Sequence, residues 1–195
     1  MKMNVLVAYA TAHGSTKEIA QRIADRLAPQ VAPGKVDILP MESVPVLNTS
    51  PTLYHAAVLG SAVHAGRWLG TARTFLDTNA GFLSGTPTKS GAAEGTTRTA
   101  IPTWAFTVGM PASDDDLAKE ETAVGDKIRK QLPQLRDHKL FRGVFEKEDL
   151  NWFFKFIINH VVPENKQRVG DHRDWQAIES WADKVGKAIT ESDAD

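Results

Sequence analysis

Three hydroxyl side chains and a glycine stand close together near the start of the chain, in the run Thr11-Ala12-His13-Gly14-Ser15-Thr16. An apolar, β-branched segment at 3–9 precedes the run and apolar residues at helical spacing follow it, which predicts a strand, a loop and a helix N-terminus. Unpaired backbone N–H groups and the positive end of the helix dipole favour an anion at such a point. With its added hydroxyl donors, the run is typical of a phosphate-binding loop.

The same residues have a simpler interpretation. Ser15 followed by Glu18 fits a capping box, in which the hydroxyls would only start a helix. Two common nucleotide motifs are absent, Gly-x-Gly-x-x-Gly after the strand and Gly-x-x-x-x-Gly-Lys-Ser/Thr anywhere, which disfavours a dinucleotide or a nucleoside triphosphate. The nucleophile pattern Gly-x-Ser-x-Gly and tight histidine spacings are also missing, so we expect no hydrolase triad and no metal site, and we identify no catalytic residue.

Composition places the chain among ordinary globular proteins. Its 195 residues, 42% hydrophobic and 24% charged, are enough for one compact domain with a full core. The net charge of -1 gives no basic excess for nucleic acid. Without cysteine there are no disulfides, thiolate metal sites or cysteine nucleophiles. No leader and no apolar stretch of spanning length is visible, so we expect a cytoplasmic protein.

Strands and helices alternate along almost the whole sequence. Apolar strand patterns occur at 3–9, 36–39, 56–61, 103–109 and 140–145, and the 40–53 segment, rich in proline, predicts a reduced second helix. This alternation predicts a single α/β domain, a three-layer sandwich around a five-stranded parallel sheet in the order 2-1-3-4-5. Three loops, at 11–16, 61–68 and 109–115, would then meet at one edge of the sheet.

The first loop resembles the phosphate loop of flavodoxins, Ser/Thr-x-Thr-Gly-x-Thr, with His13 in place of a threonine. The three loops, the reduced second helix, an insertion after the fifth strand and the Asp174-Trp175 start of the last helix are similar to the flavodoxin-domain family. That family includes the menaquinone-dependent protoporphyrinogen dehydrogenases, which bind FMN and pass electrons from a tetrapyrrole precursor to a membrane quinone. The resemblance implies FMN and these binding residues: Thr11, Ala12, His13, Gly14, Ser15, Thr16, Ser61, Ala62, Val63, His64, Gly66, Arg67, Trp68, Val108, Gly109 and Met110.

The second loop departs from the pattern of that branch. Where such proteins have a small residue followed by Ile-Arg-Tyr-Gly, this chain has Val63-His64-Ala65-Gly66. The resemblance therefore implies a fold and a cofactor and leaves the substrate open. Trp68 is a candidate to stack on the flavin ring, and Arg67 to stabilise the charge that reduced flavin develops near N1. The alternatives are a core tryptophan and a solvent-exposed arginine.

Two segments lie outside a plain sandwich. Residues 80–102, rich in Gly, Ser, Thr and Pro, predict a flexible insertion that is either a lid or disordered. Residues 146–174 contain an apolar helical pattern from Leu150 to Val162. We expect that helix either to pack on the domain's own core, or to form an oligomer interface, or to contact a membrane surface or a lipophilic ligand.

These observations support three hypotheses about function. The first is an FMN-dependent oxidoreductase acting between a lipophilic or aromatic substrate and an acceptor such as a quinone, because the charge is near neutral and an apolar helix is present. The second is an electron carrier that docks on a protein partner. The third is a flavodoxin-like fold that has lost its flavin, since fold and function are separable.

Overall fold

The computed structural model describes residues 2–47, 53–85, 99–145 and 170–191. Its main sheet has the order β2-β1-β3-β5-β6, and these five strands are parallel. This confirms the predicted order 2-1-3-4-5, with a sixth, short strand β4 paired antiparallel to β3. The strands are β1 (Val5–Ala10), β2 (Val36–Pro40), β3 (Ala56–His64), β4 (Arg67–Trp68), β5 (Thr103–Gly109) and β6 (Asp137–Arg142).

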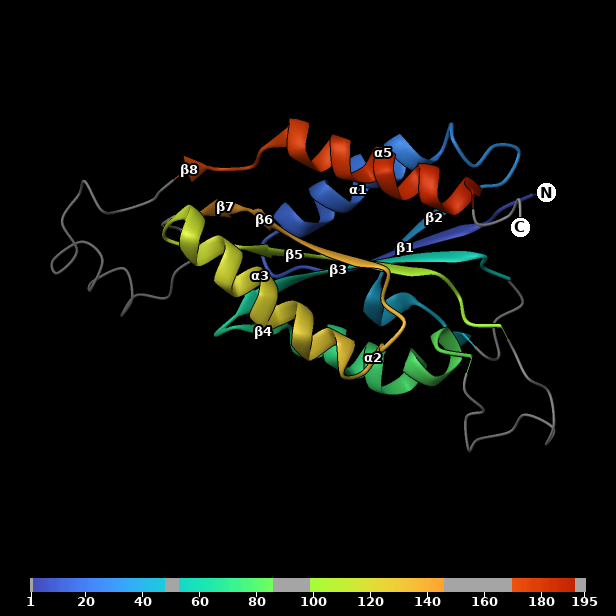
Figure 1. Cartoon of the computed structure of the whole chain (residues 1–195), viewed down its shortest axis with the longest axis horizontal. Coiled ribbons are helices and arrows are strands. Elements are labelled where there is room, and N and C mark those ends of the chain that lie inside the picture. Colours follow the sequence, from blue (N-terminus) through green and yellow to red (C-terminus); the bar gives the residue numbers. More distant parts are fainter. Residues whose placement is uncertain (1, 48–52, 86–98, 146–169, 192–195) are drawn as a thin grey trace, which may run out of the picture.

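Helices cover both faces of the sheet. In Figure 1, α1 (Ser15–Leu27) and α5 (Trp175–Glu191) lie above it, and α2 (Gly70–Leu83) and α3 (Asp114–Arg129) lie below it. Between β2 and β3, where this kind of fold usually has another helix, the described residues form only the 3-10 turn η1 (Met41–Ser43). The prolines that bracket this turn, Pro40 and Pro45, account for the reduction that the sequence predicts.

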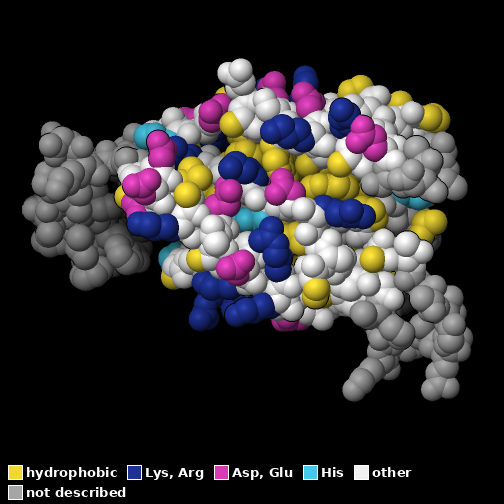
Figure 2. Space-filling view, viewed as in Figure 1, with side chains coloured by type: hydrophobic (Ala, Val, Ile, Leu, Met, Phe, Trp, Pro, Cys, Tyr) yellow, Lys and Arg dark blue, Asp and Glu magenta, His cyan; other side chains and the backbone are white. Residues whose placement is uncertain are grey.

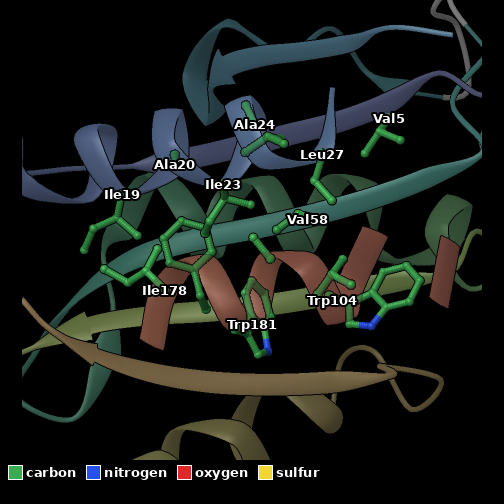
Figure 3. Packing of buried hydrophobic residues seen from close by; sticks show 14 of the residues in the cluster. Val5, Ile19, Ala20, Ile23, Ala24, Leu27, Val58, Trp104, Ile178 and Trp181 are labelled. Carbon is green, nitrogen blue, oxygen red and sulfur yellow. The ribbon is translucent and has the colours of Figure 1, made fainter. Parts of the chain in front are cut away.

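The central strand β1 is buried along its whole length. Because side chains alternate across a strand, Val5, Val7 and Tyr9 join the core on the α1–α5 side, and Leu6, Ala8 and Ala10 join the core on the α2–α3 side. Figure 3 shows the first of these cores, in which side chains of α1 such as Ile23 and of α5 such as Trp181 lie in one cluster with Val58 of β3.

Aromatic contacts hold the edge of the sheet under α5. The Trp181 ring packs edge-on against Phe106 and Phe141, with ring centroids 6.3 and 5.8 Å apart. Its Nε1–H donates to Asp137 Oδ2 at 2.8 Å, so the one polar atom of this buried ring is paired.

Two boundaries differ from the sequence-based expectation. The fifth parallel strand is β6 at 137–142 rather than 140–145, because charged residues occupy its solvent-facing positions: Lys139 pairs with Glu121 at 3.0 Å while His138 and Leu140 are buried. Residues 144–145 instead form β7 (Val144–Phe145), which pairs antiparallel with β8 (Gly170–Asp171).

The first residues of the expected flexible insertion at 80–102 belong instead to a helix. Helix α2 continues through Leu83 because Phe82 and Leu83 are buried in the core, and their packing outweighs the local glycines. The remainder of the expected insertion, at 86–98, lies outside the described residues. So does most of the insertion at 146–174, including the apolar segment from Leu150 to Val162, whose role as an interface or membrane contact therefore stays a prediction.

Candidate functional site

The carboxyl ends of three central strands bring the predicted loops together. Ala10 at the end of β1 is level with Ser61 in β3, and Ala62 is level with Val108 in β5. The side chain of Val63 lies so close to Gly109 that a Cβ on that glycine would stand only 2.9 Å from it. The second and third loops are therefore in direct contact, at the edge where open α/β sheets bind ligands.

The first loop is organised by Thr11 and Gly14. Thr11 Oγ1 accepts a hydrogen bond from Gly14 N at 2.9 Å, and Gly14 adopts a left-handed φ of 97°, which favours glycine. Helix α1 begins at the next residue with no side-chain cap. The alternative capping box of Ser15 and Glu18 is thus wrong, because Glu18 instead pairs with Arg173 at 2.6 Å.

The Thr16 side chain is the most informative group in the first loop. It is fully buried, and its Oγ1 has no hydrogen-bond partner. Buried hydroxyls are almost always paired in native proteins, and an unpaired one costs about 1–3 kcal/mol. A site that binds an oxygen-rich anion would supply the missing partner.

The second loop is a β-hairpin rather than the expected irregular loop. Strand β3 continues to His64, and β4 returns beside it after the turn at Ala65 and Gly66. Both turn residues have positive φ, 49° and 67°, as in the tight turns that match the twist of a hairpin. Lys127 of α3 donates from Nζ to Gly66 O at 2.6 Å, which holds the turn against the body of the domain.

Trp68 is a core residue and does not face the loops. It is only 5% exposed and packs in the core between the sheet and α2–α3. Its Nε1–H donates to Thr107 Oγ1 at 2.8 Å, and Thr107 in turn lies 2.8 Å from His138 Nε2. The assignment of Trp68 to flavin stacking is therefore not retained. Arg67 is exposed, in agreement with the alternative that it is a solvent-exposed arginine.

The third loop joins β5 to α3. Val108 and Gly109 are buried, and Gly109 O accepts from Gly143 N at 3.0 Å. Ser113 caps α3 by accepting from Asp116 N at 3.1 Å. Arg142, beside this loop, donates to Asp114 at 2.7 Å, while its buried Nε has no partner. All of the expected binding residues thus lie on these three loops or on the strand ends that carry them, and among them Trp68 has its side chain in the core.

Comparison with known proteins decides the family. A family model described as "Flavodoxin domain" matches residues 6–170. The chain belongs to the flavodoxin-domain family. Among curated proteins, none matches this sequence significantly.

Solved structures similar to this flavodoxin-domain chain agree in fold. A flavodoxin from the domain Archaea is 12% identical, with a TM-score of 0.55 and coverage of 96% of this chain and 99% of that one. Flavodoxin 2 from Bacillus cereus is 16% identical, with a TM-score of 0.54 and coverage of 97% and 99%. The flavodiiron core of Flv1 from Synechocystis is 12% identical, with a TM-score of 0.60. The match covers 97% of this chain and 36% of that protein.

Membership of this family indicates FMN as the cofactor, and the residues of the first loop fit its phosphate. The unpaired Thr16 hydroxyl, the left-handed Gly14 and the start of α1 supply a buried donor, an open backbone turn and a positive helix end. Within the described ranges, no group of His, Cys, Asp and Glu could hold a metal ion. Nor is any helix in those ranges long and apolar enough to cross a bilayer.

Sequence reasoning missed Arg173, which anchors the wall beside the phosphate loop. A cavity of about 220 Å3 there is lined by His13, Ser15 and Arg173 among others. Arg173 donates to both oxygens of Asp171 at 2.8 and 2.6 Å and also to Glu18, and its guanidinium lies 4.5 Å from the Trp175 ring centroid. These hydrogen bonds raise the pKa of Arg173 and lower that of Asp171. The charged run at 171–174, just before an amphipathic helix, was the available signal.

Replacing Arg173 with glutamine should lower the free energy of unfolding by about 1–2 kcal/mol, because its side chain is only 10% exposed and bridges two carboxylates on different elements. Urea denaturation measures the change. Arg26→Gln is the matched control, since Arg26 also joins two elements through a carboxylate, Asp183, but both partners are over 40% exposed. We expect a clearly smaller loss there, because water and salt screen an exposed pair. Equal losses would contradict the anchoring role.

Proposed function

We propose that this flavodoxin-domain chain is an FMN-dependent oxidoreductase that transfers electrons between a lipophilic or aromatic substrate and an acceptor such as a quinone. The proposal follows the resemblance to protoporphyrinogen dehydrogenases. The observation that carries it is the buried, unpaired Thr16 hydroxyl beneath a loop of phosphate-binding type, at the sheet edge where the second and third loops meet.

The proposed site divides between phosphate and ring. Residues 11–16 would bind the phosphate, and the ring would lie between the hairpin turn after His64 and the loop that follows Gly109. When bound, FMN supplies the electron-accepting chemistry. The chain's own residues would hold the two loops beside the ring. Lys127 fixes the hairpin turn through Gly66, and the contact of Val63 with Gly109 fixes the separation of the second and third loops. We assign no role at the ring to the side chains of Arg67 and Trp68.

An electron carrier is the second candidate. It is favoured by the likeness to solved flavodoxins, since the match covers 99% of the length of each of those proteins. The two candidates differ in chemistry: a carrier passes single electrons to a protein, and an oxidoreductase passes electron pairs to a small molecule.

The experiment is an FMN titration, followed by anaerobic reduction of the bound flavin and mixing of the reduced protein with a naphthoquinone. In a separate arm, protoporphyrinogen as electron donor is mixed with the protein that carries oxidised FMN. For the oxidoreductase we expect saturable FMN binding, reduction in one two-electron step, and reoxidation of the bound flavin by the quinone at least 10-fold faster than that of free reduced FMN. Stopped-flow absorbance measures both rates. Free FMN at the same concentration is the control.

The remaining outcomes each decide against this proposal. Reduction in two resolved one-electron steps, with quinone reoxidation no faster than for free FMN, would support the carrier instead. Absence of FMN binding by the intact, folded chain would overturn both candidates and leave the third hypothesis, a flavodoxin-like fold without flavin.

A further inference from the structure

A cavity of about 230 Å3 opens between α2 and α3, on the side of the sheet away from the phosphate loop's helix. The cations Arg67, Arg73 and Lys127 line it. Its floor is made of Trp68, Leu76, Val124 and Ile128, all buried. In Figure 2, dark blue Lys and Arg side chains gather in the lower half, over the region where Figure 1 places β4 and α3.

Among the described residues, no carboxylate forms an ion pair with the cations of this cavity. Several other arginines of the described chain pair with carboxylates, as Arg22 does with Glu179 and Arg142 with Asp114. No described carboxylate lies within ion-pair distance of Arg67 or Arg73, and Lys127 donates only to the neutral carbonyl of Gly66. Clustered, unpaired cations repel one another, so a bound anion would be favoured here.

The apolar floor of the cavity favours a ligand that has an apolar body as well as a negative charge. Trp68 has a single polar atom, Nε1, and it already donates to Thr107, so the ring offers only apolar surface. Leu76, Val124 and Ile128 add aliphatic surface. A simple inorganic anion would use the cations and leave this floor unfilled, whereas a ligand with an apolar body would use both.

We propose that this cavity binds a small organic anion with an apolar body, of the aromatic carboxylate class. Its carboxylate pairs with the guanidinium groups of Arg67 and Arg73, which can accommodate carboxylates in bidentate geometry. Its ring lies on the Trp68 floor. The volume is below that of most drug-sized sites, which limits the ligand to roughly one or two fused rings. The site is separate from the proposed flavin site and does not depend on FMN.

The test is a titration of the whole chain, with and without FMN, using 1-naphthoate, the neutral analogue 1-naphthalenemethanol, and sulfate. Isothermal calorimetry gives the affinities, and tryptophan fluorescence reports contact with Trp68. We expect 1-naphthoate to bind with a Kd of about 1 mM or tighter. The alcohol and sulfate should bind at least 10-fold more weakly, and 0.5 M salt should weaken the naphthoate binding several-fold.

Variants locate the site. Arg73→Gln should weaken naphthoate binding at least 10-fold, and Arg73→Glu should abolish it, with no change in FMN binding. Arg129→Gln is the matched control, because Arg129 lies on α3 but pairs with Asp126 and does not line the cavity. Both replaced side chains are at the surface, so circular dichroism should show folded protein in each case.

Three results would overturn the proposal. Naphthoate binding that is unaffected by Arg73→Gln would place it elsewhere, and equal binding of sulfate would reduce the cavity to a general anion patch. Binding of a poly-glutamate peptide more tightly than naphthoate, with loss on Arg73→Gln, would assign the surface to an acidic protein partner instead. Because the titration is read without FMN as well, failure of the proposed oxidoreductase function would leave this result unaffected.

Discussion

Replacing Thr16 with valine should weaken FMN binding about 100-fold while leaving the free protein at least as stable as before. In the free chain the Thr16 hydroxyl is buried without a partner, so its removal relieves a cost of about 1 kcal/mol or more. In the bound chain the same change removes a hydrogen bond to a charged phosphate, which is worth about 1.5–3 kcal/mol. Fluorescence titration of FMN and urea denaturation of the free protein measure the two effects.

A second buried threonine provides the matched control. Thr103 is as fully buried as Thr16, but its Oγ1 donates to Ile101 O at 2.8 Å. We expect Thr103→Val to lower the free energy of unfolding by about 1 kcal/mol and to leave the FMN affinity unchanged. If Thr16→Val destabilises the free protein as Thr103→Val does, or keeps the FMN affinity, the phosphate role of Thr16 is wrong.

The order of the sheet was predictable because burial on both faces leaves a strong mark on the sequence. Strand β1 is apolar at all six positions, a pattern that is expected only of a strand with both faces covered. Strand β6 was placed three residues late because it is at the edge of the sheet, where Asp137 and Lys139 are used in pairs with Trp181 and Glu121. Such pairs join residues far apart in sequence, so no local pattern shows them.

The strand–loop–helix form of residues 11–16 was predictable for a related reason: the residues that set it are consecutive in the sequence. The second loop was not, because its form depends on Ala65 taking a positive φ, for which alanine gives no signal, and on Lys127 of α3 holding the turn. Trp68 was misassigned because a tryptophan next to a loop looks the same in sequence whether it faces a ligand or the core. The hydrogen bond to Thr107, 39 residues away in the sequence, holds the Trp68 ring in the core.

The stability of the chain should fall by about 3 kcal/mol as the pH drops from 6.5 to 4, through His138 alone. His138 is 6% exposed, and burial lowers its pKa from 6.5 to about 4. The unfolded chain therefore binds a proton between these values that the native chain does not, and the stability present above pH 6.5 is lost as the pH falls. Urea denaturation at intervals from pH 7.5 to 4 measures the slope.

Burial is the main reason that His138 stays neutral, and the contact that it shares with Thr107 fits the neutral ring. Trp68 can only donate, so Thr107 Oγ1 accepts from it and turns its own hydrogen toward His138 Nε2. That nitrogen is then an acceptor, and the ring's interaction with the backbone of Glu121 raises the pKa and offsets only part of the effect of burial. In this neutral tautomer the Thr107 hydroxyl faces an acceptor, and protonation of Nε2 would require that hydroxyl to turn its hydrogen away.

His138→Gln should therefore flatten the decline in stability between pH 6.5 and 4, since glutamine can accept from Thr107 without titrating. His64→Gln, at an exposed position on the hairpin, is the matched control and should leave the slope as it is in the parent chain. The acid-sensitive carboxylates Asp171 and Asp183 have lowered pKa values and lose their contribution only below the usual aspartate range, outside this window. A parent-like slope in His138→Gln would show that another group carries the pH dependence, and that the Trp68–Thr107–His138 chain does not hold the ring neutral.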